Sequence, residues 1–385
     1  MKIKKDKFHK KEIVFIVAYI CFFSALFLGD VAINSNGVQI FTKMLRYVSY
    51  MLTIVQMLIH RATLKQLASE VVIWIISMLF FIFTKDIYLP MIVMLIFGSK
   101  DSSEEHLRDI SLKILVIGTV LVVFACFVGI IPDIMTAKAF SNELTRHSYG
   151  FYHSNILPNN LLMIEILMAW KYKEKISAFF IMLFLILHFI VYVLSTSRMC
   201  LLVGVALTVI LLVFKLNRKL RKKNRWMSFA AYCITPVCSI LSIVFMFFVN
   251  TNRIVQKMDL LFSCRFSISY LKMHSTGLRL FNFISNESFF RDGLVLDNGY
   301  LFVLMRYGFI ALIAINFVSY ILIRKYRKDT FNLICLSCIF IIAFIDNLFL
   351  SYRFLPFLIL TVIHPENART TSKLSFDKLY FGRKK

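Results

Sequence analysis

The sequence predicts an all-α fold, a polytopic membrane bundle of about 12 helical spans with one large extracytoplasmic loop. Two observations lead to this prediction. Of the 385 residues, 59% are hydrophobic, whereas soluble globular chains have about 45–50%. The apolar residues also gather in runs, most of them close to the length that crosses a bilayer as a helix. We therefore expect the whole chain, 1–385, to form a single polytopic membrane domain.

A membrane-spanning helix needs about 20 predominantly apolar residues. Runs that meet or approach this length lie, in chain order, at 13–29, 38–59, 71–84, 87–98, 110–131, 151–170, 176–196, 199–214, 228–249, 299–323, 331–350 and 354–363. The first run follows a lysine-rich start and ends in FLGDVAINSN without a small-residue cleavage site, which favours an uncleaved signal anchor. The third and fourth runs are short and are separated by TKDIYLP. They form either a hairpin that crosses twice or a re-entrant pair.

The formal charge of +24 is concentrated in short connectors, among them MKIKKDKFHKKE (1–12), KLNRKLRKKNR (215–225) and RKYRK (324–328). Cytoplasmic loops carry an excess of Lys and Arg, so the charge indicates orientation and not a nucleic-acid partner. With the N-terminus inside, the inner segments are 60–70, 99–109, 171–175, 215–227, 324–330 and the tail after 364. The outer connectors are then 30–37, 85–86, 132–150, 197–198, 250–298 and 351–353.

The outer segment 250–298 is longer than a simple connector between helices needs to be. Six apolar side chains recur in it at three- and four-residue spacing: Val255, Met258, Phe262, Phe266, Tyr270 and Met273. This spacing predicts an amphipathic helix that lies on the outer surface or closes over a cavity.

Seven of the eight cysteines lie within apolar runs, and only Cys264 lies in a polar segment. The pair in CLSC (335–338) has no His or further Cys near it in sequence, whereas a zinc site needs four converging ligands. The chain also lacks a Walker loop, GxGxxG, HExxH and GxSxG. We therefore expect neither a metal nor a cofactor.

Arginines on the predicted outer side are the first candidate site residues. Arg198 interrupts a long apolar stretch in STSR, and Arg146, Arg265 and Arg279 lie in outer segments. A charged side chain at the centre of a span costs roughly 2.5–3.5 kcal/mol. An arginine near the boundary can extend its side chain to the lipid headgroups. A group of them also suits a pyrophosphate, because the guanidinium fork matches phosphate oxygens two at a time.

Polar residues at two predicted helix starts extend the candidate site. His153 and Asn155 lie near the membrane boundary in RHSYGFYHSNILPNNLL (146–162), and Asp297 and Asn298 begin the tenth apolar run. Asn and His within spans often make helix-to-helix hydrogen bonds instead of doing chemistry. Asp297 also has an ordinary explanation as a helix N-cap.

Four motifs in this order resemble those of bacterial capsular polysaccharide and O-antigen repeat-unit polymerases of the Wzy type. GFYHSN is similar to their GF-x-HPN, STSR to their (S/T)GSR, LFSCR…STGLRLF to their L-x-SGR…YG-x-x-LFG, and LDNGYL to their DNxYL. The resemblance extends from about residue 85 to 313. Ser154 stands where the family motif has proline, Thr196 and Cys264 stand where it has glycine, and LRLFNF lacks the final glycine.

The resemblance implies a multi-pass glycosyltransferase of the bacterial cytoplasmic membrane. It would join undecaprenyl-pyrophosphate-linked oligosaccharide repeats into a surface polysaccharide at the outer face. Its partners would be the lipid-linked substrate, membrane lipid, and a flippase and chain-length regulator of the same pathway. O-antigen ligases share parts of the pattern, and a lipid-linked oligosaccharide flippase or other transporter is the alternative from another class.

On this reading Arg198 and Arg265 bind the pyrophosphates, and either His153 or Asp297 takes the acceptor proton. The remaining candidates contact substrate: Arg146, Asn155, Ser197, Arg279 and Asn298.

Overall fold

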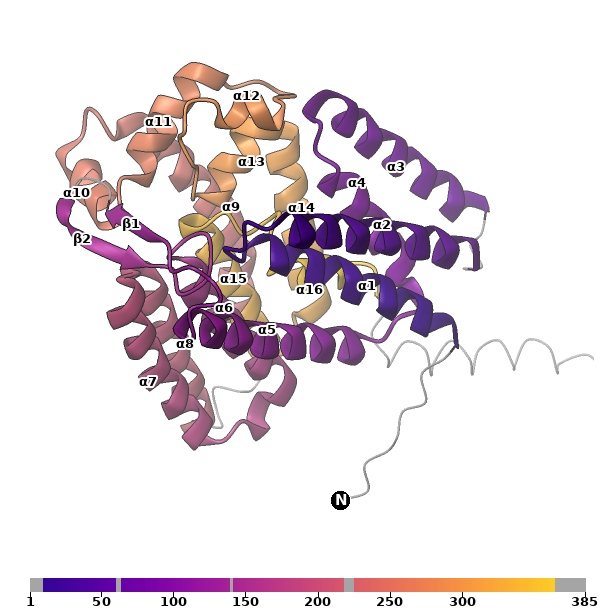
Figure 1. Cartoon of the computed structure of the whole chain (residues 1–385), viewed down its shortest axis with the longest axis horizontal. Helices are drawn as coiled ribbons and strands as arrows, with labels where there is room; N and C mark the ends of the chain where they lie inside the picture. Colours follow the sequence, from indigo (N-terminus) through magenta and orange to yellow (C-terminus); the bar gives the residue numbers. More distant parts are fainter. Residues whose placement is uncertain (1–9, 60–63, 139–140, 218–224, 364–385) are drawn as a thin grey trace, which may run out of the picture.

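The computed structural model describes residues 10–59, 64–138, 141–217 and 225–363. These residues form a bundle of α-helices with one small β-hairpin (Figure 1). Of the predicted basic clusters 1–12 and 215–225, residues 1–9 and 218–224 lie outside the described residues, as does the tail 364–385.

Most helices follow the apolar runs. Their bounds are α1 Lys10–Gly29, α2 Asn36–Ile59, α3 Leu64–Thr84, α4 Tyr88–Gly98, α5 Glu104–Phe127, α6 Ile156–Tyr172, α7 Ala178–Ser195, α8 Arg198–Leu216, α9 Arg225–Phe248, α10 Arg253–Leu261, α11 Arg265–Thr276, α12 Asn286–Phe290, α13 Gly299–Tyr307, α14 Phe309–Tyr326, α15 Thr330–Ile345 and α16 Leu355–Ile359. Short 3₁₀ turns, η1 Ser99–Asp101 and η2 Lys173–Lys175, follow α4 and α6.

The protein is a helical membrane protein. Among the described residues, 6 helices are long and apolar enough to cross a bilayer: Glu12–Gly29, Gln66–Thr84, Glu104–Phe127, Ala178–Ser195, Arg225–Phe248 and Phe309–Tyr326. Tyr88–Gly98, Cys200–Leu216 and Thr330–Ile345 are apolar but shorter. The count of twelve spans therefore stays a prediction.

Helix α2 buries its polar side and exposes its apolar side. Thr42, Ser49, Thr53 and Gln56 are buried, and Ser49 Oγ donates to the carbonyl of Ala18 on α1 at 2.8 Å. The exposed positions are large and apolar, among them Ile40, Phe41, Met44, Met51 and Leu58. A surface helix of a soluble protein has the opposite arrangement, so this helix faces lipid.

The predicted tenth span is not continuous, because Gly308 divides it into α13 and α14. Gly308 has φ 95°, and a Cβ there would lie 2.4 Å from the carbonyl oxygen of Leu280. The chain after α11 pairs with this break: Phe309 N–H donates to Arg279 O at 3.1 Å, and Ile310 N–H donates to Leu280 O at 3.2 Å. The outer loop is thus fastened to the bundle at the helix break.

The prediction of one amphipathic helix over 255–273 is wrong in one respect, because the segment forms two helices, α10 and α11. The break lies at Ser263 and Cys264, which both have left-handed backbones. The Asp259 carboxylate accepts hydrogen bonds from the backbone N–H of Phe266 at 2.7 Å and of Ser267 at 3.2 Å, and so stabilises the start of α11. Phe266 packs edge-on against Phe245 of α9, so this part of the loop covers the bundle.

The outer segment 132–150 contains the exception to the all-α prediction. Strands β1 Met135–Lys138 and β2 Ser141–His147 pair antiparallel, with an irregularity between Ala137 and Lys138. Asp133 closes the base of the hairpin. Its carboxylate accepts from Ser148 N–H at 2.9 Å and Tyr149 N–H at 2.8 Å, and lies 2.5 Å from His147 Nδ1.

A buried polar contact joins α6, α7 and α8. His188 Nε2 lies 2.7 Å from the Glu165 carboxylate, and Thr208 Oγ1 donates to the same group at 2.8 Å. Gly204 allows this arrangement, because a Cβ there would lie 2.4 Å from the His188 ring. The contact holds α8, which carries Arg198 at its first turn, in register with α6.

Candidate functional site

A cavity of about 710 Å³ lies where several predicted outer connectors meet. Asp30, Asp86, Asp297 and Arg353 line it, each from a different one of these connectors. A second cavity, of about 600 Å³, is lined by residues of the predicted inner connectors, including Arg108, Lys171, Lys173 and Lys328. Connectors that charge and parity assigned to the same side therefore lie together.

Three of the four predicted arginines gather around Asp297, which lines the larger cavity. Arg265, which begins α11, is only 8% exposed, and its Nη2 lies 3.4 Å from the Asp297 carboxylate. Arg146 comes from β2. Burial lowers the pKa of Arg146, nearby Arg265 and Arg198 lower it further, and Asp297 opposes them. These side chains are thus near enough for their charges to interact, and we call Arg146, Arg198 and Arg265 the arginine trio.

The trio has buried hydrogen-bond donors that the described residues do not satisfy. Arg265 Nε and Nη1 and Arg146 Nε are buried and donate to no hydrogen-bond acceptor among the described residues. Leaving a buried polar group unpaired costs about 1–3 kcal/mol, and more for a charged one. Several such donors on adjacent guanidiniums suit an anion with many oxygens.

Two helix starts add to this positive region. Arg198 is exposed at the first position of α8, and Arg265 occupies the first position of α11. A helix N-terminus carries partial positive charge and unpaired N–H groups, which favours anions there. Ser197, the N-cap of α8, is buried at 6% exposure and makes no side-chain cap hydrogen bond.

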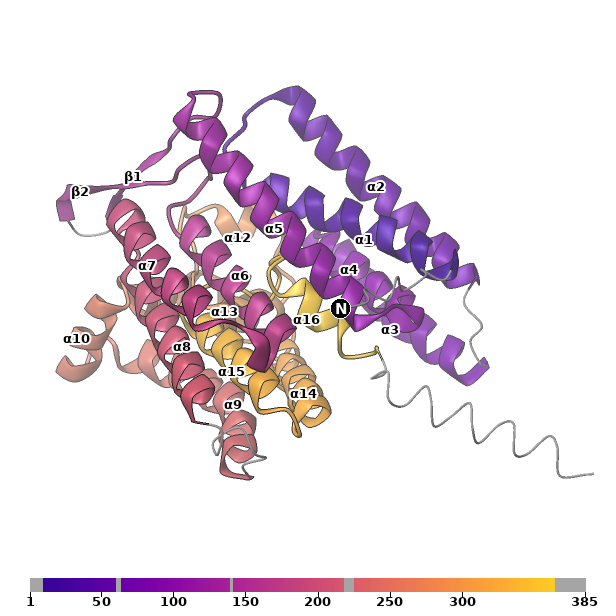
Figure 2. The ribbon, with the colours of Figure 1, turned by 90° about the horizontal axis from the view of Figure 1, so that it is seen from below.

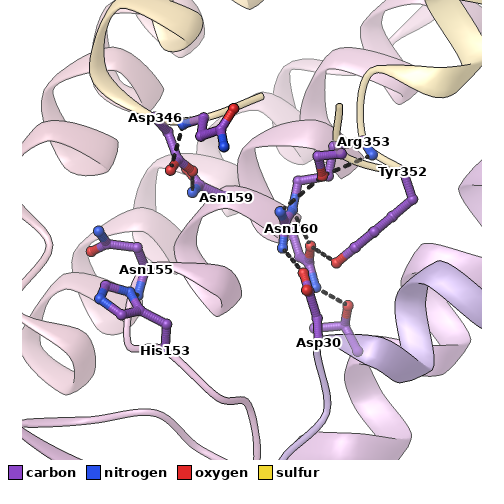
Figure 3. Close-up of polar contacts among 11 residues, drawn as sticks. Asp30, His153, Asn155, Asn159, Asn160, Asp346, Tyr352 and Arg353 are labelled. Carbon is purple, nitrogen blue, oxygen red and sulfur yellow. Dashed lines mark hydrogen bonds and ion pairs between the residues drawn. The ribbon is translucent and has the colours of Figure 1, made fainter. Parts of the chain in front are cut away.

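His153 and Asn155 line the cavity at the start of α6 (Figure 3). The backbone N–H of Asn155 donates to His153 Nδ1 at 3.2 Å. In the neutral ring the other nitrogen, Nε2, then carries the hydrogen. His153 is exposed and Asn155 is buried. In this arrangement the histidine offers a donor, and not a free lone pair, to the cavity.

The sequence reasoning missed a second set of polar residues at the site (Figure 3). Asn159 of α6 hydrogen-bonds the Asp346 carboxylate, and Asp346 is close enough to Asp297 and Arg265 to interact with their charges. Asp346 lies in the apolar run 331–350. An ionisable residue within such a run indicates a functional site by default, so this signal was present in the sequence.

A network around Arg353 closes another wall of the cavity (Figure 3). Arg353 Nη2 lies 2.9 Å from the Asp30 carboxylate, and its Nε donates to Asn160 Oδ1 at 2.8 Å. The Tyr352 hydroxyl donates to the same amide oxygen at 2.8 Å. These contacts join the outer end of α1 to α6 and to the turn before α16.

Arg306 and Asp86 form a further pair in the cavity wall. Arg306 Nη2 lies 2.6 Å from the Asp86 carboxylate, and the Tyr307 hydroxyl donates to that carboxylate at 3.1 Å. Both ionic side chains are buried. The pair ties α13 to the short linker between α3 and α4.

Two predicted site residues lie elsewhere. Arg279 is exposed, and its carbonyl pairs with Phe309 N–H at the break between α13 and α14. Asn298 is fully buried as the N-cap of α13: it accepts from Leu301 N–H at 2.9 Å and donates to Ser242 Oγ at 2.9 Å and Phe344 O at 2.8 Å. The helix cap is thus Asn298 and not Asp297, which leaves the Asp297 carboxylate to face Arg265.

Comparisons of this chain with protein-family models, with curated proteins and with solved structures found no match.

Proposed function

We propose that this protein is a membrane glycosyltransferase that joins lipid-pyrophosphate-linked oligosaccharide repeats into a polymer, as the motif resemblance implies. The observation that carries the proposal is the arginine trio, whose buried, unsatisfied donors lie beside the carboxylate of Asp297. This combination provides an anion site and a proton acceptor next to each other, as transfer of a glycosyl group from a pyrophosphate requires.

The reaction assigns a task to each group. A hydroxyl oxygen of the acceptor sugar forms a bond to the anomeric carbon of the donor, and the bond from that carbon to the pyrophosphate oxygen breaks. The electron pair of the broken bond stays on the pyrophosphate, where Arg265, Arg198 and Arg146 stabilise the growing charge. The hydroxyl proton passes to Asp297.

The geometry favours Asp297 over His153 as the proton acceptor. Asp297 presents a partly exposed carboxylate, with 28% of its side-chain surface accessible, at the cavity wall. His153 already accepts at Nδ1 from Asn155. A protonated His153 would have to give up that hydrogen bond, so its Nε2–H is better suited to donate to a sugar or phosphate oxygen.

Backbone conformation supports the motif resemblance at Thr196 and Cys264, two of the three positions where the chain lacks the glycine of the family motifs. Thr196 has φ 53° and Cys264 has φ 60°, both in the left-handed region that glycine adopts without strain. Gly277 of the STG motif has φ 70°. The chain thus has left-handed turns at positions where the resemblance leads us to expect glycine.

An oligosaccharide flippase is the main alternative from another class. A transporter presents its charged groups to both sides in turn, near the middle of the membrane. Here the polar residues that line the larger cavity lie in predicted outer connectors or in the outer halves of predicted spans. This distribution favours an enzyme.

Deletion of the gene in the cells that make the protein tests the proposal. A polymerase deletion should leave single repeats on their lipid carrier at the outer face, accessible to an impermeant glycosidase or lectin. A flippase deletion should trap the same repeats inside. Full-length polymer on an altered anchor in the deletion strain would instead indicate a ligase.

A further inference from the structure

Arg46 of α2 is a half-buried cation that the mechanism above does not use. Its guanidinium lies over the ring of Tyr88, 5.1 Å from the centroid. Its Nε is buried without a hydrogen-bond partner, and no carboxylate of the described residues forms an ion pair with it. An arginine within an apolar helix is retained at a cost, which indicates a function.

The other arginines on this flank of the cavity are already neutralised. Arg306 pairs with Asp86, and Arg353 pairs with Asp30. Both aspartates line the cavity with Arg46. Among the described residues that line the cavity, Arg46 is therefore the arginine that contacts no carboxylate. The two other carboxylates of the lining, Asp297 and Asp346, contact Arg265 and Asn159.

A smaller cavity of about 170 Å³ leads from Arg46 along α2. Gly29 and Arg46 line both cavities, and Thr42, Lys43 and Tyr152 line the smaller one. The opposite side of α2 is apolar and exposed, with Phe41 and Met44 among its side chains. A ligand with a charged headgroup and a long apolar tail fits this arrangement, because the head reaches Arg46 while the tail stays in lipid.

Arg46 lies far from the arginine trio in the fold. Figures 1 and 2 both show β2 and α8, which carry Arg146 and Arg198, on one flank, and α2 on the opposite flank. The larger cavity extends between Asp297, which contacts Arg265 of the trio, and Arg46. The two cationic regions are therefore separate sites at the two sides of one cavity.

We propose that Arg46, assisted by Lys43, binds the pyrophosphate of a second lipid-linked oligosaccharide, the acceptor, while the trio binds that of the donor. This inference rests on the proposed function. The donor reacts at the carbon attached to its pyrophosphate, so its pyrophosphate must lie beside Asp297. The acceptor reacts at its non-reducing end, so its pyrophosphate lies a whole repeat away from the reacting hydroxyl. Two pyrophosphate sites distinguish a polymerase from a ligase whose acceptor carries no lipid pyrophosphate.

Binding stoichiometry tests this inference. The full chain in phosphatidylcholine nanodiscs is titrated with farnesyl pyrophosphate, and bound molecules are counted by native mass spectrometry, with farnesol as the uncharged control. We expect two pyrophosphate-dependent sites in the wild type, one in Arg46→Gln, one in Arg265→Gln and none in the double variant. Arg253→Gln, which changes an exposed arginine of α10, is the matched control and should keep two.

These outcomes distinguish the second pyrophosphate site from the proposed donor site. The number of sites in the wild type is measured without any variant, so it does not depend on whether a variant folds. One wild-type site that Arg265→Gln removes and Arg46→Gln leaves intact would overturn the second site and keep the proposed donor site. One site that only Arg46→Gln removes would contradict the assignment of the donor to the trio. Full displacement from Arg46 by an equal amount of phosphatidylglycerol would show that this site takes ordinary phospholipid, which would overturn the inference.

Discussion

The backbone amide of Asn155 donates a hydrogen bond to Nδ1 of His153 across 3.2 Å. This contact occupies the nitrogen that would receive a proton and leaves Nε2–H directed to other partners. It separates the roles of two residues that the sequence alone left as equal candidates for the base.

The first prediction compares His153 with Asp297. Asp297→Asn keeps the size of the side chain but removes the basic oxygen, so polymerisation should slow by about 10²–10⁴-fold, as for loss of a general base. His153→Gln keeps an N–H donor and should retain most of the rate. The length of polymer made per unit time, at matched protein level, is the measurement. The reverse order of the two effects would make His153 the base.

The second prediction concerns the arginine trio. Loss of a hydrogen bond to a charged group costs about 1.5–3 kcal/mol, which corresponds to roughly ten- to hundredfold in rate if the bond acts in the transition state. Arg265→Ala and Arg198→Ala should each show such a fall. Arg265→Lys should also be impaired, because an ammonium lacks the planar fork. Polymer length on a gel measures the effect, and exposed Arg253→Ala should leave it unchanged. Normal polymer in Arg198→Ala would return that residue to a role at the lipid headgroups.

The third prediction uses the left-handed backbones of Thr196 and Cys264. A non-glycine residue in this region is strained by about 1–2 kcal/mol. Glycine relieves the strain but adds freedom to the unfolded chain, so Thr196→Gly and Cys264→Gly should each stabilise the protein by up to about 1 kcal/mol. Thermal unfolding in detergent measures this. Ala206→Gly within α8 is the control and should destabilise by about 1 kcal/mol. Destabilisation by all three glycines would show that these two turns are not strained.

The fourth prediction is a pH dependence of the hairpin. Burial alone would raise the pKa of Asp133. The hydrogen bonds from His147 and from the amides of Tyr149 and Ser148 outweigh this effect, so the pKa of Asp133 is lowered. A carboxyl with a lowered pKa in the folded state contributes stability above its ordinary value of about 3.9, and this is lost as the pH falls through the folded value. Hydrogen exchange of the amides between Asp133 and Tyr149 should therefore accelerate in that acidic range. Asp133→Asn should abolish this acceleration at acidic pH. If the acceleration persists in the variant, another titrating group is responsible for it.

The fifth prediction concerns sidedness. Cys264 lies in the predicted outer loop but is only 8% exposed, and burial raises the pKa of its thiol. An impermeant maleimide should therefore label wild-type Cys264 slowly, because the thiolate is the reactive form. A cysteine placed at exposed Lys257 of α10 should label rapidly in intact wall-stripped cells. Labelling of Lys257→Cys only after lysis would reverse the orientation.

The sequence was sufficient for the features that depend on composition and local pattern. Long apolar runs predict helices wherever the chain must satisfy its backbone hydrogen bonds in lipid, so most helix positions agree with the runs. The distribution of Lys and Arg predicted which connectors share a side. The arginines and Asp297 were found because a charge beside an apolar run is costly and needs a reason.

Tertiary structure alone decided which of these residues meet. Arg46, Asp346 and Arg353 are far from Asp297 in sequence, and no local pattern relates residues on different helices. The break at Gly308 depends on Leu280, whose carbonyl approaches too closely for a side chain. Local pattern also left the roles of His153, Asp297 and Asn298 open. Whether such a side chain acts as a hydrogen-bond donor, a general base or a helix cap depends on the hydrogen-bond partners that the folded chain places around it.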